Sequence, residues 1–385
     1  MNKRHLLQLG ALGASAYLWP RLGATQTAPN RDWPDLTLAA AWRVGPDTPG
    51  NWVGLLHVDW RSAHVTVKAA VPVPTRAHGL LAEADGGFLA VATRPGSWLL
   101  RCDADGKVVR RHAVDSETSG RTLDGHVCAS ADGAWLYTAE TDAGSGQGWV
   151  SVRERTSLRK VAQWSTHGAE PHQLLVDAQG AVLVANGGLL RGEGDKKRDL
   201  HRMDSSLVRL DPRTGERLGQ WRLKDARLGV RHMAWNQPAA NGAGTKRLLG
   251  IALQNEHDDL TQRRNAPVLA IWDGEELHTP SLVSAGGGYA GDIVAGPDGG
   301  FILSCVRTHV ALQWRAAAPQ EMVVVAQLQE VGALAPWETS QSPAGEPQGV
   351  LLAAARGLGR WHPGVAPALL KWPAGMALDN HWVQV

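Results

Sequence analysis

The chain has 385 residues, of which 43% are hydrophobic and 20% charged, and its formal net charge at pH 7 is +2. This balance is typical of a globular protein, and the small charge gives no reason to expect nucleic acid or an anionic membrane as a partner. No run of 18 or more apolar residues follows the N-terminus, so no membrane span is expected after it. The 44 glycines and 21 prolines favour many short strands joined by turns.

The first 28 residues have the pattern of an export signal. A basic start through His5 precedes the apolar residues 6–18, and small residues follow at 24–28. The Lys3-Arg4 pair resembles a twin-arginine signal with lysine in the first place, although an ordinary secretory signal fits the same stretch. We therefore predict a periplasmic protein in which residues 1–28 are removed and residues 29–385 form the folded domain.

A unit of two strand-like runs joined by a polar turn recurs along the rest of the chain. Four copies open with a histidine, and a fifth opens with Tyr289. The successive histidines His78, His126, His172 and His232 are 48, 46 and 60 residues apart. This period is that of a β-propeller blade with loop insertions, in which four-stranded sheets pack around a channel. The predicted fold class is therefore all-β, a single β-propeller.

The predicted blades follow one another in chain order. Blade four carries an insertion at about 189–199, and blade five carries an unusual loop from Asn255. Residues 331–385 are expected to supply the last blade, so that seven blades are predicted and six or eight stay possible. The expected blades are 36–74, 76–113, 121–164, the His172 unit to about 223, 230–283, 288–329 and 331–385.

The four histidines predict a site if they open the innermost strand of each blade. Side chains at equivalent positions of consecutive blades then converge near one mouth of the channel. Imidazole is a common ligand of iron, copper and zinc, so the histidines are candidate metal ligands. The alternative is that the repeat reproduces a turn residue four times without any function.

Polar residues near these histidines are candidate neighbours of the site. Guanidinium groups there could hold an anion or a carboxylate by paired hydrogen bonds, and carboxylates could orient the imidazoles. Turn caps and surface ion pairs are the alternative for any single residue. The candidates are Arg76, Arg121, Glu140, Glu170, Arg231, Gln254, His257, Tyr289 and Asp292.

Motifs of several enzyme classes are absent. The sequence contains no nucleophile elbow, no zinc-protease motif, and neither a Walker sequence nor a dinucleotide fingerprint, so no nucleotide cofactor is expected. It also lacks Cys-x-x-Cys-His, which argues against covalent haem.

An ordered set of short segments resembles the exported β-propeller family catalogued as domain of unknown function 1513. The segments are Arg76–Gly79, Arg94–Gly96, Gly125-His126, Tyr137–Glu140, Glu170–His172, Val184–Gly188, Met203–Val208, Arg231-His232 and Gln254. Two departures, Leu123-Asp124 and Ser304–Arg307, leave the histidines in place. The resemblance implies a twin-arginine signal and a WD40-like or quinoprotein-like propeller. It also implies a link to iron acquisition, because such genes often stand beside those of imelysin-type and di-haem peroxidase-like proteins.

Together these observations give a functional hypothesis. We expect a periplasmic propeller that binds iron or copper through His78, His126, His172 and His232, as an accessory to iron uptake with imelysin-type partners. One rival is a metal-dependent oxidoreductase or lactonase-like hydrolase at the same mouth, so whether the protein is an enzyme stays open. Another rival is a metal-free scaffold that docks a partner protein.

Overall fold

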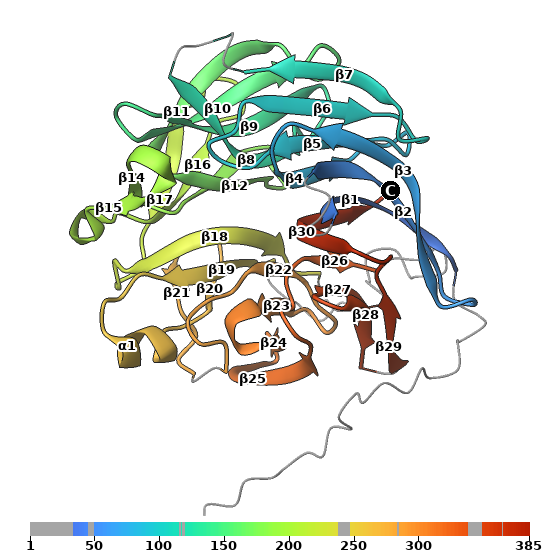
Figure 1. The fold of residues 1–385 in the computed structure, drawn as a ribbon. Helices are drawn as coiled ribbons and strands as arrows, with labels where there is room; N and C mark the ends of the chain where they lie inside the picture. The colour runs from blue at the N-terminus through green and yellow to red at the C-terminus, as the bar shows by residue number, and fades with distance from the viewer. Residues whose placement is uncertain are drawn as a thin grey trace, which may run out of the picture.

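The computed structural model describes residues 34–44, 50–114, 117, 120–237, 247–282, 285–337, 349–363 and 365–385. Seven antiparallel four-stranded sheets are arranged around a central channel, which confirms the predicted seven-bladed β-propeller (Figure 1). The predicted export signal lies outside the described residues. Among the described helices, none is long and apolar enough to cross a membrane.

Six blades are formed by consecutive segments of the chain, each running from the innermost strand outwards. Blade two contains β4 (Ala77–Ala82), β5 (Phe88–Ala92), β6 (Trp98–Cys102) and β7 (Val108–Ala113), and blade three contains β8 (Arg121–Ala129), β9 (Trp135–Asp142), β10 (Gln147–Glu154) and β11 (Lys160–Ala169). Blade four contains β12 (Pro171–Val176), β13 (Val182–Asn186), β16 (Ser206–Leu210) and β17 (Arg217–Trp221), and blade five contains β18 (Leu228–Trp235), β19 (Leu249–Asn255), β20 (Leu269–Trp272) and β21 (Leu277–His278). Blade six contains β22 (Asp292–Ala295), β23 (Phe301–Cys305), β24 (Val310–Arg315) and β25 (Ala318–Gln327), and blade seven contains β26 (Leu334–Pro336), β27 (Val350–Ala354), β28 (Gly357–His362) and β29 (Val365–Lys371).

The remaining blade joins the two ends of the described chain. Its outer strands are β1 (Leu36–Val44), β2 (Asn51–Asp59) and β3 (His64–Val73), and its innermost strand is β30 (Met376–Gln384), which pairs antiparallel with β1. This corrects the expectation that residues 331–385 all belong to the last blade. Pairing the C-terminal strand with an N-terminal one closes the ring and removes two free sheet edges, which would otherwise be open to association.

Burial follows strand position within a blade. The second strand β5 (Phe-Leu-Ala-Val-Ala) is buried at every residue because blades cover both of its faces, whereas the outermost strand β7 has no buried residue. Apolar clusters fill the space between neighbouring blades, and they include the buried Trp98, Trp272 and Trp314. Tryptophan therefore serves largely as inter-blade packing, as its broad rings allow.

Two insertions lie at one end of the channel. The blade-four insertion forms a short hairpin, β14 (Leu190–Arg191) and β15 (Lys197–Arg198), with the 3-10 turns η1 (Glu193–Asp195) and η2 (Leu200–Arg202) beside β15. The blade-five loop forms the helix α1 (Leu260–Asn265), whose N-terminus is capped by the Asp259 side chain. Both lie on the left of Figure 1, at the end where the innermost strands begin.

Candidate metal centre

A β-bulge in the innermost strand displays each histidine of the cluster. Pairing with the second strand shifts register between Ala77 and Leu80 in β4, and equivalent shifts occur in four other blades. The extra residue of a bulge bends the strand and re-aims its side chain. Five histidines lie inside these bulges: His78, His126, His172, His232 and His381.

The imidazoles meet around His232. Its Nε2 atom lies 2.9 Å from Nε2 of His172, 3.3 Å from Nε2 of His126 and 3.1 Å from Nε2 of His381. The ring of His78 packs edge-on against those of His126 and His381, each with a centroid separation of 4.7 Å. The structure therefore brings all four predicted histidines together and adds a fifth.

One set of four mutually close ring nitrogens differs from the predicted set by one residue. One nitrogen from each of His78, His126, His232 and His381 lies within 4.8 Å of the other three. His172 joins this set from the side, through His232. The four predicted histidines are only 3 to 8% exposed, so the cluster lies inside the channel and deeper than the predicted mouth.

Glycines allow the innermost strands of blades two and three to approach this closely. Gly125 has a φ of +100°, and a Cβ there would lie 2.7 Å from the His78 ring. A Cβ on Gly79 would lie 2.5 Å from the carbonyl oxygen of Gly125. Gly125 therefore leaves room for the His78 ring, and Gly79 leaves room for the backbone of Gly125.

Hydrogen bonding alone cannot satisfy this cluster. A neutral imidazole Nε2 either carries one proton or offers one lone pair, yet His232 Nε2 has three nitrogen neighbours at 2.9–3.3 Å. Both ring nitrogens of His78 and the Nδ1 atoms of His172 and His232 are buried without a hydrogen-bond partner among the described residues. A cation at the centre would accept several lone pairs at once.

Burial keeps the histidines neutral. It lowers the pKa of His78, His126, His172 and His232 well below the ordinary 6.5. The repulsion that two protonated imidazoles would exert on one another, and that of nearby arginines, lowers the pKa further. Neutral imidazole is the form that binds a metal ion. The cluster is therefore prepared for a cation at neutral pH.

Asp292 occupies the place of a histidine in blade six. Its Oδ2 atom lies 3.4 Å from Nδ1 of His381 and accepts a 2.9 Å hydrogen bond from the Leu334 backbone N–H. Burial would raise the pKa of Asp292, but the attraction of His381 and His232 and these hydrogen bonds lower it overall, which favours the carboxylate. A carboxylate behind a ligating imidazole fixes the orientation of that ring.

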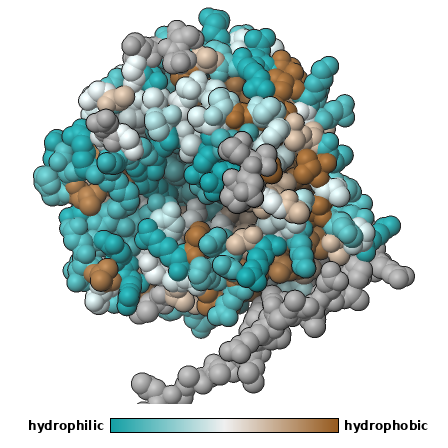
Figure 2. All heavy atoms as spheres, viewed as in Figure 1, coloured by the Kyte–Doolittle hydropathy of each residue, from teal (hydrophilic) through white to brown (hydrophobic). Residues whose placement is uncertain are grey.

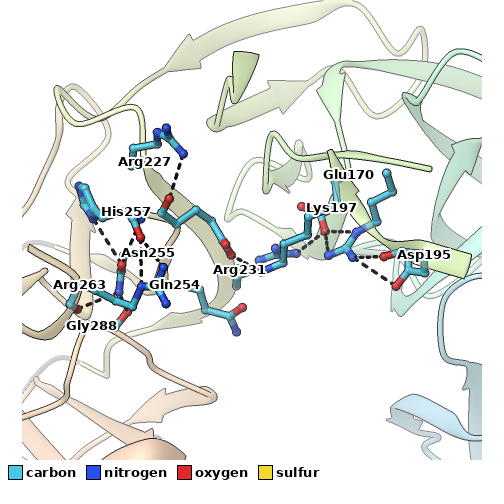
Figure 3. Close-up of polar contacts among 12 residues, drawn as sticks. Glu170, Asp195, Lys197, Arg227, Arg231, Gln254, Asn255, His257, Arg263 and Gly288 are labelled. Atoms are coloured by element: carbon cyan, nitrogen blue, oxygen red, sulfur yellow. Dashed lines mark hydrogen bonds and ion pairs between the residues drawn. The ribbon is translucent and has the colours of Figure 1, made fainter. Parts of the chain in front are cut away.

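A second charged group lies at the end where the innermost strands begin. The buried Glu170 carboxylate is contacted by Arg231 at 3.0 Å, Arg94 at 3.2 Å and Arg191 at 2.7 Å. Burial would raise the pKa of Glu170, but these guanidiniums lower it overall. Arg191 also reaches Asp195 in the β14–β15 hairpin, and Figure 3 shows Arg231, Glu170 and Asp195 in one connected network. Figure 2 shows a hollow beside this hairpin with mostly hydrophilic residues around it.

Asp124 also belongs to this charged end and was not predicted. It lies two residues before His126, is 3% exposed and accepts a 2.6 Å hydrogen bond from the Thr141 hydroxyl. Burial raises its pKa to about 7, so its charge changes near neutral pH. The only sequence signal for Asp124 was that Leu123-Asp124 departs from the family pattern.

Three other predicted neighbours engage partners elsewhere. Arg76 pairs with Asp379, with Nε 2.8 Å from Oδ2. The Arg121 guanidinium lies 4.0 Å from the centre of the Trp149 ring, with Asp142 at 3.9 Å. Glu140 is completely buried against Arg153, 2.7 Å from its Nη2. None of the three makes a hydrogen bond or ion pair with an imidazole of the cluster.

Gln254, His257 and Tyr289 have their partners around the α1 loop and the start of blade six. His257 Nε2 lies 3.0 Å from Asp225, and Gln254 donates to the backbone carbonyl of Ala290. Tyr289 bridges Gln254 through the backbone and carries the Arg307 guanidinium 4.0 Å from its ring centre. These contacts occupy Gln254, His257 and Tyr289, and none of the contacts involves a histidine of the cluster.

His381 is the residue that the sequence analysis missed. The repeat unit is a histidine followed by a hairpin, but the partner strand of β30 is β1, which lies at the other end of the chain. The available signal was that residues 36–74 supply only three strands, so a C-terminal strand had to complete that blade.

The fold and this cluster define a seven-bladed β-propeller with converging histidines inside its channel. Residues 71–385 match the family described as protein of unknown function (DUF1513), and the chain belongs to that family. None of the curated proteins compared matches the sequence.

Solved structures share the fold at low sequence identity. A hydrazine synthase of Kuenenia stuttgartiensis is 12% identical with a TM-score of 0.56, covering 92% of this chain and 99% of that one. A streptogramin B lyase is 11% identical with a TM-score of 0.53, covering 77% and 83%. A catalytically inactive virginiamycin B lyase from Staphylococcus aureus, solved with quinupristin, is 9% identical with a TM-score of 0.52, covering 80% and 92%. At these identities the likeness concerns the fold alone.

Proposed function

We propose that this protein binds one transition metal ion, iron or copper, in the histidine cluster of its channel. The observation that carries the proposal is the convergence of three Nε2 atoms on that of His232, at 2.9–3.3 Å. With metal–nitrogen bonds of about 2.0–2.1 Å, two nitrogens bound to one ion are about 2.9 Å apart at a right angle and about 3.4 Å apart in a tetrahedron. The three separations from His232 Nε2 match those between ligands of a single ion.

The number of donors supports iron or copper. Five imidazoles converge, whereas structural zinc sites take four ligands. Imidazole suits iron and copper as well as zinc, and copper(II) binds most tightly among the divalent first-row ions. Asp292, behind His381, would orient that ring toward the metal.

Metal analysis tests the proposal. The parent protein should contain, or take up on titration, one equivalent of iron or copper. A variant with His126, His172 and His232 all changed to Ala should lose it while keeping the far-UV circular dichroism of the parent. A matched control changes the exposed His64, His201 and His278 to Ala and should keep the metal. No uptake by the parent would refute the proposal.

The role in iron acquisition rests on the family resemblance and on the signal-like N-terminus. We propose that the protein works in the periplasm beside an imelysin-type partner. Cell fractionation and co-purification of the full-length chain test this, and a cytoplasmic location would refute it. The metal-free scaffold stays the alternative if no metal binds.

A further inference from the structure

The channel beyond the histidines contains a cavity of about 620 Å³. All seven innermost strands contribute to its wall, and the lining residues are those at and after the histidines in the chain direction, such as Leu80 after His78 and Met233 after His232. His126, His381 and Asp292 line it as well. The cavity therefore adjoins the histidine cluster on the side opposite to the Glu170 network.

Most of the residues that line this cavity are of apolar types, and no lysine or arginine is among the described ones. Leu80, Met233, Ile293, Leu334 and Trp382 are typical of it. Its ionisable side chains are the two histidines and Asp292, all of which already belong to the proposed centre. An anionic ligand would meet no countercharge from the wall, and burying a charge there is costly.

The uncharged polar side chains of the wall are those of Gln173 and Gln384. Gln173, directly after His172, accepts a hydrogen bond from the Met233 backbone N–H through its Oε1 atom. This bond fixes the side-chain amide and leaves its NH₂ group as a donor toward a ligand. A volume of about 620 Å³ lies within the range of about 300–1,000 Å³ that small-molecule pockets have.

We infer that this cavity receives an uncharged, largely apolar small molecule with one nitrogen, oxygen or sulfur donor that binds the metal directly. The inference rests on the proposed function, since the metal holds the donor end of the ligand. The apolar wall holds the rest of the molecule, and its burial supplies affinity. The Glu170 network gives the opposite side of the cluster a charged character, so the two sides are not equivalent.

The test uses the full chain loaded with one equivalent of copper(II), the divalent ion expected to bind most tightly. Three probes are titrated while the visible copper absorption is followed: 4-phenylimidazole, its anionic analogue 4-(imidazol-4-yl)benzoate, and azide. We expect 4-phenylimidazole to shift the band and to bind at least about tenfold more tightly than the benzoate analogue, because the charge is buried. Equal affinities would overturn the inference.

Two variants narrow the cavity at partly exposed positions of its wall. Ala234→Phe and Ala295→Phe should each lower the affinity for 4-phenylimidazole at least about tenfold, with copper content and azide binding unchanged. Ala162→Phe on the exposed outer strand β11 is the matched control and should behave as the parent. Unchanged phenylimidazole binding in both folded cavity variants would overturn the inference.

The two proposals fail in distinguishable ways. A protein that takes up no metal refutes the proposed function and this inference with it. A protein that holds copper, but whose absorption is unaltered by 4-phenylimidazole, overturns the inference alone and leaves a closed metal site. Metal content is therefore measured on every sample before titration.

Discussion

Replacing Asp292 by Asn tests whether the carboxylate behind His381 controls the proposed metal centre. Asp292 accepts hydrogen bonds from the backbone N–H groups of Leu334 and Ile293, both at 2.9 Å, and its Oδ2 faces Nδ1 of His381 at 3.4 Å. Asn has one oxygen in place of two, so at least one of these three donors would face an NH₂ group. The substitution changes few atoms and removes one negative charge.

The expected loss follows from the role of a carboxylate behind a ligand. Removing such a partner weakens metal binding about 10- to 100-fold, which corresponds to about 1.4–2.7 kcal/mol. Leaving a buried donor without an acceptor should also cost about 1–3 kcal/mol of folding stability. Copper(II) affinity is measured by titration against a competing chelator, and stability by urea unfolding of the metal-free protein.

Asp379→Asn is the matched control. Asp379 lies two residues before His381 on the same strand and is buried, but its carboxylate binds Arg76. The control should lose stability while its metal affinity stays within about threefold of the parent. If Asp292→Asn binds copper as tightly as the parent, or if the two variants lose affinity equally, Asp292 does not orient the ligand.

Two further predictions concern stability. Glu140→Gln should destabilise the fold by about 3 kcal/mol in urea unfolding without changing metal content, because it removes one of the two carboxylates, those of Glu140 and Glu117, that pair with the completely buried Arg153 guanidinium. A loss of metal would instead make Glu140 part of the centre. The metal-free protein should lose stability as the pH falls below about 6.5, since burial lowers the pKa of His78, His126, His172 and His232 and the unfolded chain then binds more protons. The loss should reach roughly 1 kcal/mol for each of these four histidines by pH 5.5 and should be much smaller in the variant with His126, His172 and His232 changed to Ala. Equal acid sensitivity of the two proteins would refute this assignment.

The sequence by itself determined the blade repeat and four of the five clustered histidines. Each of those blades begins with a histidine-bearing strand and an adjacent hairpin, so the relevant contacts are local and repeat with a readable period. Turn residues and alternating apolar runs then specify the strands, because neighbouring segments pair with one another. The repetition therefore predicted that the four histidines occupy equivalent positions in consecutive blades.

Only the tertiary structure decided how the ring closes and which groups face the cluster. His381 enters through the pairing of β30 with β1, a contact between the two ends of the chain that no local pattern encodes. The bulges turn the histidines inward, while Arg76, two residues before His78, and Glu140, on the strand paired with that of His126, pair with other residues. Charged side chains choose partners by distance in space, so ion pairs and cavities depend on the packed blades, whereas strands and turns depend on neighbours in the chain.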